Sequence, residues 1–512
     1  MTSGNPIKKI INFAIPILVS TLISHAYTLA DTAIVGRYLG ENAFAAVGAS
    51  STIIYFIFAT FGALCNGCSI ITAHKYGAKD TEGIKRSVAS CYTIAGITAL
   101  LIMAIVIPLL PYFLGLLKTP EGEIFEDSKR YLLILFLGLP ISAVANVVAT
   151  SIRAFGDSLT PTFSLIVSAV LNVGLNILFI IKLGMGVEGV ALATVIAQFF
   201  ATATIYAIGI RKHPQLAPGF KYWKNELISY WNHLRIAIPM ALQFQGTAIG
   251  FVMLQSALNI MGKDTINTYT IGVRTEQFLG SLFAAIGASI ATFVAQNYGA
   301  GLYSRIRLGI KQITTVIVIL TVLASLILTF GSEVAINLFL DEASPELYPK
   351  VKMYLRVSAV LYICLTLLYV HRNTLQGLGK AFVPLVSGIM ELIARVCCSL
   401  YVIQVVKETK GLFGTIDPLE AAANVVEKVT ASYNSAFWGI SLANPLSWLL
   451  AEVVLIVAYI ARRRTDKTCN CKTLLILAHI NTGHEVLIIE KELRKRLCQL
   501  GFSYTCCSEE KE

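Results

Sequence analysis

Long apolar runs follow one another along almost the whole chain, and they constrain its fold more than any other feature. A bilayer core about 30 Å thick requires roughly 20 apolar residues per helix. On this criterion the sequence predicts twelve membrane-spanning helices, at residues 14–35, 46–73, 88–113, 131–151, 160–181, 187–208, 236–260, 276–297, 310–331, 351–371, 381–404 and 436–460. We therefore predict an all-α, multi-pass membrane protein.

The composition indicates a surface that faces lipid. Of the 512 residues, 55% are hydrophobic and 14% are charged, and the mean hydropathy is +0.69. A soluble domain has about 25% charged residues, so this chain cannot cover several soluble domains with a polar surface. The net charge of +11 comes from short Lys and Arg clusters between the apolar runs. Since these clusters form no single basic face, we expect no nucleic-acid partner.

Basic residues collect in alternate loops and predict the orientation of the chain. An excess of Lys and Arg marks the cytoplasmic side of a membrane protein. With the first residue inside, the intracellular loops contain the basic clusters at 75–86, 211–235, 305–311 and 462–464, whereas the opposite loops at 121–127 and 341–346 are acidic. We therefore expect both termini to be cytoplasmic.

The sequence also repeats itself. Three landmarks recur at an offset of 222 or 223 residues and a fourth at 250: Ile15-Pro16 with Ile238-Pro239, Tyr76-Gly77-Ala78 with Tyr298-Gly299-Ala300, Gly156 and Pro161 with Gly379 and Pro384, and 189–194 with 439–444. This pattern predicts one duplicated unit of six spans, with an insertion of about 27 residues between 407 and 435, on the outer face.

Because six is an even number, both halves enter the membrane from the same side. Parallel repeats of this kind are typical of transporters that alternate access around a cavity. We expect four parts: an N-terminal six-helix lobe (1–212), a cytoplasmic linker (213–235), a C-terminal six-helix lobe (236–464) and a cytoplasmic tail (465–512).

Asp31, in the first span, is the foremost candidate for a functional residue. Ionisable groups inside a bilayer are expensive and are candidates for function by default. No basic residue lies at helical spacing from Asp31 within its span. Such a carboxylate can exchange a proton, a sodium ion or a cationic substrate, although a purely structural role as a hydrogen-bond acceptor remains an alternative.

Three further polar residues belong with Asp31. Asn172 and Asn176 in the fifth span are four residues apart and face the same way. With Thr194 in the sixth span they supply neutral oxygens, which together with one carboxylate suit a proton or a monovalent cation better than a divalent one. The alternative is that these amides only join neighbouring helices.

The second half contains other polar residues within its spans. Glu391 and Arg395 are four residues apart and predict a structural ion pair along one helix. Gln243, Gln245 and Glu276 are candidates for lining a polar cavity. The chain lacks the sequence motifs of phosphate-binding loops, nucleophile elbows and zinc proteases. We expect no enzyme activity, no cofactor and no metal site.

Several motifs recur in order in both halves and resemble one known family. They are D-T-A-I-V-G at 31–36, A-H-K-Y-G-A-K at 73–79 with A-Q-N-Y-G-A-G at 295–301, and R-A-F-G-D-S-L-T-P at 153–161 with L-Q-G-L-G-K at 375–380. Residues 8–464 resemble the multidrug and toxic compound extrusion (MATE) family. The resemblance implies twelve transmembrane helices in two six-helix lobes around a central cleft.

The resemblance also implies an activity: secondary antiport of organic cations, drugs and other amphipathic compounds against sodium ions or protons, in the cell (inner) membrane, with the lipid bilayer as surroundings. We expect a monomer.

In that family a cation site uses an aspartate in span one, an Asn and an Asp four apart in span five, and a threonine in span six. Asp31, Asn172 and Thr194 match this set, whereas Asn176 stands where the family often has the Asp.

Two other functions remain open. A lipid-linked oligosaccharide flippase of similar architecture would carry a more cationic cavity, whereas the spans here contain few Lys or Arg beyond Arg395. A membrane-bound sensor would signal through the tail, in which we expect a short strand at 473–478 and an amphipathic helix at 485–500.

Overall fold

The computed structural model describes residues 1–117, 119–224, 226–339, 347–413 and 422–468. All regular structure within these residues is helical, which confirms the predicted all-α class. The chain forms two compact units, Met1–Leu455 and Ile456–Glu512. The site and the contacts described below lie within the first unit. The strand and helix that we predicted in the tail fall outside the described residues.

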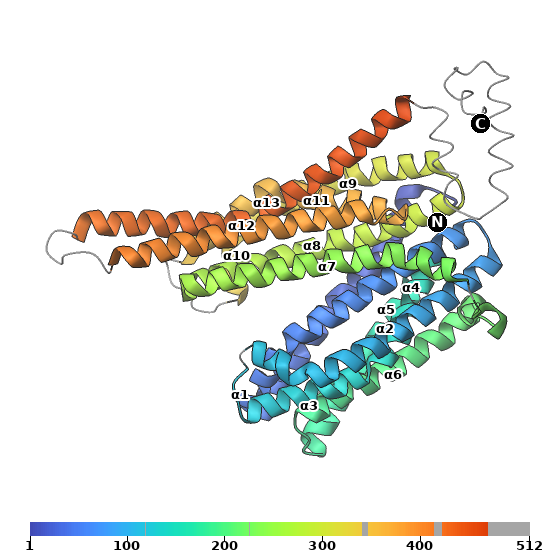
Figure 1. Cartoon of the computed structure of the whole chain (residues 1–512), viewed down its shortest axis with the longest axis horizontal. Helices are drawn as coiled ribbons and strands as arrows, with labels where there is room; N and C mark the ends of the chain where they lie inside the picture. The colour runs from blue at the N-terminus through green and yellow to red at the C-terminus, as the bar shows by residue number, and fades with distance from the viewer. Residues whose placement is uncertain (118, 225, 340–346, 414–421, 469–512) are drawn as a thin grey trace, which may run out of the picture. The chain divides into compact units, whose positions relative to one another are not determined.

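Figure 1 shows the helices in chain order. Their bounds are α1 Pro6–Gly77, α2 Thr81–Leu116, α3 Glu123–Leu137, α4 Leu139–Ala154, α5 Leu159–Asn176, η1 Ile177–Lys182, α6 Val187–Lys212, η2 Pro214–Leu216, η3 Phe220–Tyr222, α7 Leu227–Met261, α8 Lys263–Gly299, α9 Tyr303–Phe330, α10 Ser332–Phe339, α11 Leu347–Gly377, α12 Phe382–Phe413 and α13 Ala422–Thr468.

Among the described residues, ten helices are long and apolar enough to cross a membrane, and an eleventh span is the pair α3 and α4, which meet at a bend of 48°. This pair covers the predicted span at 131–151. The 72-residue helix α1 contains both of the first two predicted spans, 14–35 and 46–73. The predicted span at 160–181 is formed by α5 and η1 together, and each of the remaining predicted spans coincides with one helix.

The backbone of α1 leaves the helical conformation at Gly40. Its φ of 84° and ψ of −173° suit glycine, which has no Cβ. A Cβ at Gly36 would lie 3.1 Å from the ring of Phe44. Eight residues of straight helix rise about 12 Å, so Gly36 and Phe44 lie closer together than an uninterrupted helix would place them. Gly40 therefore interrupts α1 between the two predicted spans.

The stretch at 407–435, where we predicted an insertion, is largely helical within the described residues. Helix α12 continues to Phe413 and α13 begins at Ala422, so most of this stretch extends the two helices. The sequence offsets predict where the extra residues lie but not their conformation, because polar residues are compatible with both a loop and an exposed helix.

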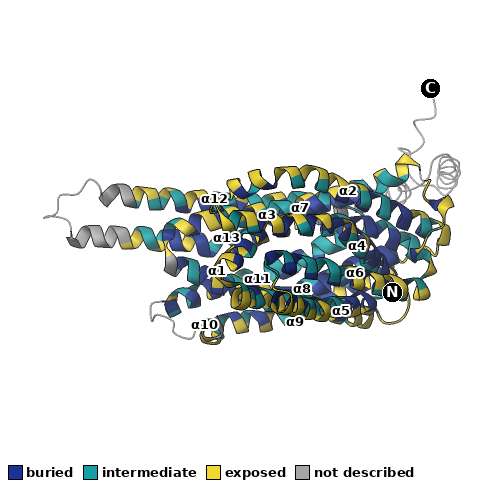
Figure 2. Cartoon of the chain, turned by 90° about the horizontal axis from the view of Figure 1, so that it is seen from below, coloured by how far each residue is buried: buried dark blue, intermediate teal, exposed yellow. Residues whose placement is uncertain are grey.

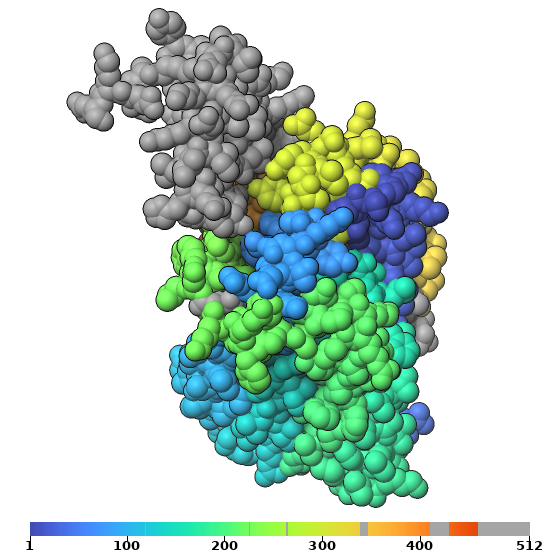
Figure 3. Space-filling model, turned by 90° about the vertical axis from the view of Figure 1, so that its right-hand side faces the viewer, coloured from blue at the N-terminus to red at the C-terminus, as the bar shows by residue number. Residues whose placement is uncertain are grey.

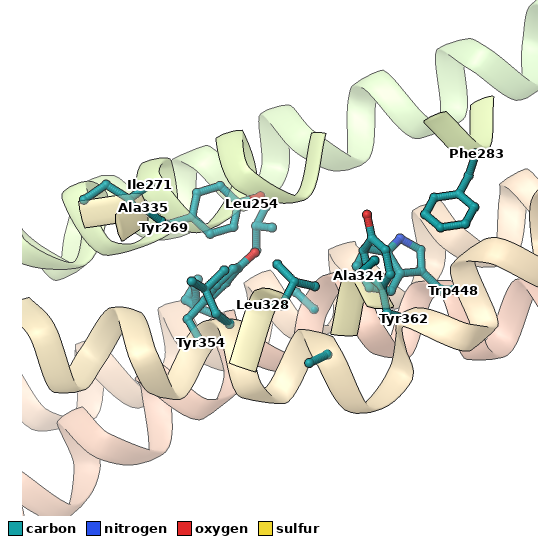
Figure 4. Close-up of a cluster of buried hydrophobic side chains, with 14 of the residues drawn as sticks. Leu254, Tyr269, Ile271, Phe283, Ala324, Leu328, Ala335, Tyr354, Tyr362 and Trp448 are labelled. Carbon is teal, nitrogen blue, oxygen red and sulfur yellow. The ribbon is translucent and has the colours of Figure 1, made fainter. Parts of the chain in front are cut away.

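The interior of the second half is apolar and includes several aromatic side chains. Large aromatic residues fill the interior of the second half, where the rings of Tyr269 and Tyr354 meet edge to face with centroids 5.8 Å apart and Tyr362 contacts Trp448 in the same way (Figure 4). Exposed and buried residues alternate along the same helices (Figure 2). The exposed ones include Ile319, Val322 and Leu323 of α9, as expected for a surface in contact with lipid.

The ends of α1 and α8 cross through a symmetric pair of glycines. A Cβ at Gly77 would overlap the carbonyl oxygen of Gln296, and a Cβ at Gly299 would overlap the carbonyl oxygen of His74. Gly77 and Gly299 are equivalent in the repeat, as are His74 and Gln296. Both helix backbones therefore approach each other more closely than any side chain would permit.

Side chains hold the same crossing to neighbouring elements. His74 Nε2 lies 2.8 Å from the carbonyl oxygen of Gly377, and Gln296 Nε2 donates to the carbonyl oxygen of Ala154 at 2.7 Å. Arg305, at the start of α9, donates to the carbonyl oxygen of Gly4 at 2.7 Å. Figure 3 shows this end of the molecule, where the N-terminal residues (dark blue) lie beside the beginning of α9 (yellow). The two halves are thus joined at this end by packing and by hydrogen bonds.

We expect Gly77→Ala and Gly299→Ala each to lower the apparent melting temperature of the purified protein. The added methyl group must push α1 and α8 apart, and overpacking of this kind costs about 1–3 kcal/mol. Gly96→Ala in α2 is the matched control, because no atom lies within 4 Å of its added Cβ and Ala favours a helix over Gly by up to about 1 kcal/mol. Equal melting temperatures for all three variants would contradict the close crossing.

Candidate functional site

The structure brings together the four residues that we predicted around Asp31. Asp31 lies on α1, Asn172 and Asn176 on α5, and Thr194 on α6. Asn176 Nδ2 donates to Asp31 Oδ1 at 2.5 Å and to Asn172 Oδ1 at 2.9 Å. Asn172 Nδ2 donates in turn to Thr194 Oγ1 at 3.1 Å. Residues from three helices therefore form one continuous hydrogen-bonded chain.

Local structure explains why these side chains meet. Residues four apart lie on the same face of a helix, which aligns Asn172 with Asn176. Thr194 Oγ1 donates to the carbonyl oxygen of Val190 one turn earlier, and this bond fixes its orientation. Helix α5 widens into the π-helix η1 directly after Asn176. Such π-helical turns are frequent at functional sites.

The geometry leaves oxygen atoms available to a cation. Asn172 and Asn176 are almost fully buried, with exposed fractions of 1% and 0%. Asn176 Oδ1 is buried and makes no hydrogen bond within the described residues, although buried polar atoms normally have a partner. This oxygen and the carboxylate of Asp31 are suitable ligands for a proton or a monovalent cation.

Two tyrosines near this site were not predicted from the sequence. Tyr27 and Tyr131 both lie within range of an electrostatic interaction with the carboxylate of Asp31. Tyr27 precedes Asp31 by four residues, so helical spacing was a sufficient signal for it. Tyr131 lies on α3, and only the packing of α3 against α1 brings it there.

The three candidates for a polar cavity lie in different surroundings. Gln243 is buried, and its side-chain amide lies 3.0 Å from the side-chain amide of Gln376. Gln245 donates to the carbonyl oxygen of Phe56 at 2.9 Å and so joins the two halves. Glu276 is also buried, and its Oε2 accepts a hydrogen bond from Tyr354 at 3.5 Å. No contact connects Gln243 or Glu276 directly with Asp31.

The predicted pair on α12 is part of a larger cluster. Arg395 Nη1 lies 3.3 Å from Glu391 Oε2. Arg372 of α11 makes a short ion pair with the other oxygen of Glu391. Arg372 was not predicted from the sequence, and neither was the pair of His371 with Glu452, whose Nδ1 and Oε1 atoms are 2.6 Å apart. These contacts join separate helices, and no spacing within one helix indicates them.

Within the described residues, no group of three or more His, Cys, Asp or Glu side chains could hold a metal ion. This finding agrees with a site that contains a single carboxylate. A divalent cation requires several charged oxygen ligands, whereas a proton or a monovalent ion does not.

Comparison with known proteins gives a consistent result. A model of the protein family described as MatE matches residues 16–178 and 239–399, one match in each half. Over 312 residues the chain is 28% identical to the probable multidrug resistance protein YpnP of Bacillus subtilis, covering 60% of this chain and 68% of YpnP. Over 388 residues it is 24% identical to the probable multidrug resistance protein NorM of Thermotoga maritima, covering 74% of this chain and 82% of NorM.

Solved structures share the fold. The chain superposes with a TM-score of 0.76 on a crystal structure of MATE in the bent conformation, with 19% sequence identity, covering 91% of this chain and 98% of the other. Structures of this kind have twelve helices in two lobes, which confirms the predicted fold class.

We expect Asn176→Leu to lower the apparent melting temperature by several degrees. The substitution leaves Asp31 Oδ1 and Asn172 Oδ1 without their donor, and each unsatisfied buried polar group costs about 1–3 kcal/mol. Asn66→Leu is the control, because Asn66 is exposed and bonds only to a carbonyl oxygen of its own helix. If the two variants melt at the same temperature, the hydrogen-bonded chain contributes nothing to stability.

Proposed function

The chain belongs to the MATE family of multi-pass membrane transporters, and we propose that it exports organic cations and other amphipathic compounds in exchange for sodium ions or protons. Members of this family are multidrug efflux transporters and not enzymes. The exchanged ion binds at Asp31 in the first lobe, residues 1–212. The second lobe extends over residues 236–464, and both termini are cytoplasmic.

The contact between Asp31 and Asn176 is the observation that supports this proposal most directly. A carboxylate within the apolar part of a membrane protein is costly unless its charge is compensated. The amide of Asn176 donates to it at 2.5 Å, but supplies no positive charge. A proton or a monovalent cation would supply the missing charge, and the same amide group has an oxygen, Asn176 Oδ1, that makes no hydrogen bond within the described residues.

Exchange follows from differential affinity. A ligand shifts a conformational equilibrium only by as much as it binds one state better than the other. If the ion at Asp31 favours the state in which the drug binds weakly, the inward ion gradient drives the release of the drug, and the drug reciprocally weakens the binding of the ion. This mechanism requires no direct contact between the two ligands.

The number of carboxylates limits the positive charge that the site can bind. Asp31 is the acidic member of the hydrogen-bonded chain, and its partners are the uncharged Asn172, Asn176 and Thr194. One carboxylate balances one positive charge. We therefore propose one proton or one sodium ion per transport cycle in a protein that acts as a monomer in the cell (inner) membrane.

The flippase alternative is less compatible with the charges in the second lobe. Recognition of a pyrophosphate group requires basic side chains that are available to the ligand. Arg372 and Arg395 are instead both engaged by Glu391. Both arginines are therefore already paired within the protein, so we favour the antiporter.

We expect Asp31→Asn to abolish gradient-driven efflux of ethidium from proteoliposomes. Sodium and proton gradients are imposed separately, and the gradient that drives transport by the wild type identifies the ion. Loss of the carboxylate removes the ion-dependent charge but preserves the size of the side chain. The control is Glu188→Gln, since Glu188 forms an exposed pair with Arg130 at 3.1 Å that is worth at most about 1 kcal/mol.

If the wild type moves ethidium under neither gradient, the antiporter proposal is wrong for this class of substrate. Gradient-driven efflux by Asp31→Asn at the wild-type rate would instead preserve the antiporter but exclude Asp31 as its ion site. The two outcomes therefore separate the function from the site.

A truncated chain distinguishes the antiporter from a sensor that signals through its tail. We expect deletion of residues 465–512 to leave ethidium efflux within about twofold of the full chain, because the proposed site and both lobes precede the deletion. The measurement is the initial efflux rate per reconstituted molecule. Complete loss of efflux with normal expression and folding would favour a functional role for the tail.

A further inference from the structure

The internal repeat assigns a counterpart in the second half to each residue of the Asp31 site. The offset of 223 relates Asp31 to Leu254, Asn172 to Arg395 and Asn176 to Ser399, and the offset of 250 relates Thr194 to Asn444. The structure supports this correspondence. Asn172 Nδ2 and Thr194 Oγ1 are 3.1 Å apart, and so are Arg395 Nε and Asn444 Oδ1. The same two positions contact each other in both halves.

The charges at the corresponding positions differ. Leu254, the counterpart of Asp31, is fully buried among apolar and aromatic side chains (Figure 4). The counterpart of the neutral Asn172 is the guanidinium of Arg395, which is 1% exposed and lies 4.5 Å from the ring centre of Phe251. The second half therefore contains a permanent positive charge at a position where the first half has a neutral amide.

Two carboxylates of the second half are connected with this charge, one by direct contact and one through hydrogen bonds. Glu391 lies 3.3 Å from Arg395 and also pairs with Arg372. On the other side, Asn444 Nδ2 donates to the hydroxyl of Tyr354 at 3.4 Å, and this hydroxyl donates to Glu276 Oε2 at 3.5 Å. Hydrogen bonds thus connect Arg395 with Glu276 through Asn444 and Tyr354.

The charges of these four side chains can balance one another without an external cation. Glu276 and Glu391 carry two negative charges when both are ionised, and Arg372 and Arg395 carry two positive charges. Buried charges are tolerated when they are paired and hydrogen-bonded. Removal of Arg395 would leave one negative charge in excess, in a region where Glu276 Oε1 already lacks a hydrogen-bond partner within the described residues.

We propose that Arg395 is a tethered cation, which takes in the second lobe the role that the exchanged ion takes at Asp31. The second lobe then binds no external cation, and ion exchange is confined to the first lobe. The structure also contains a latent site for a monovalent cation between Glu276 and Glu391, and the guanidinium of Arg395 occupies this site. This inference rests on the proposed function only for the role of Asp31, because the latent site belongs to the second lobe alone.

The test is cation binding by the purified full chain. The apparent melting temperature is measured as sodium chloride replaces choline chloride at pH 8, and again on a step from pH 8 to pH 6 in choline chloride alone. A cation that binds only the folded protein raises this temperature. We expect Asp31→Asn to abolish the sodium or proton dependence of the wild type, which would show that the second lobe binds neither ion.

The gain of a site is the decisive result. We expect the double variant Asp31→Asn, Arg395→Asn to regain a cation-dependent shift of similar size to that of the wild type, and additional Glu391→Gln to remove it. The matched control is Asp31→Asn with Arg395→Lys, which keeps the positive charge and should show no shift. If the folded double variant shows no shift, or if Asp31→Asn alone retains one, the proposal is overturned.

A variant that adds an arginine to the first lobe tests the proposal if Arg395→Asn prevents folding. Asn172→Arg places a guanidinium beside Asp31, as Arg395 lies beside Glu391. We expect it to fold, to lose the cation dependence and to melt near the temperature of the ion-loaded wild type. A retained cation dependence would overturn the proposal. Absence of any dependence in the wild type would contradict the proposed coupling at Asp31, whereas the Arg395 variants would still test the latent site.

Discussion

A charge within the apolar interior of a membrane protein costs several kcal/mol or more unless an opposite charge or strong hydrogen bonds compensate it. The two halves of this chain meet this requirement in different ways. Asp31 accepts a hydrogen bond from Asn176 at 2.5 Å, and we propose that an exchangeable ion balances its charge. Glu391 instead contacts two arginines of its own half. The proposed division of labour between the lobes follows from this difference.

The packing between the halves, in contrast, has kept the symmetry of the repeat. Gly77 and Gly299 each lie against a backbone carbonyl group of the other half, at equivalent positions of α1 and α8. Close backbone contact tolerates no side chain on either helix, so both positions are subject to the same constraint. The interiors of the lobes face no such constraint from each other, and their charged residues differ. The duplicated fold therefore preserves a shared crossing and carries two dissimilar sites.

The sequence predicted the existence of the helices better than their ends. Apolar length sufficed for all twelve spans because a bilayer leaves a chain few alternatives to the helix. It did not show that the first two spans would be assigned to one helix with an interruption at Gly40, or that α3 and α4 would bend by 48°. It also predicted an insertion near 407–435 without indicating that α12 and α13 would extend into this stretch.

The sequence by itself determined the helical class, the internal repeat and the alignment of Asn172 with Asn176, because hydropathy, fixed offsets and four-residue spacing can all be read along one chain. Asp31 was indicated as an ionisable residue in an apolar span, and the family resemblance implied that it belongs with Thr194. Only the tertiary structure decided that Tyr131 lies near Asp31 and that Arg372 shares Glu391 with Arg395. These partners lie on different helices. Their proximity depends on how the helices pack, and a pairing between separate helices leaves no periodic trace in one sequence.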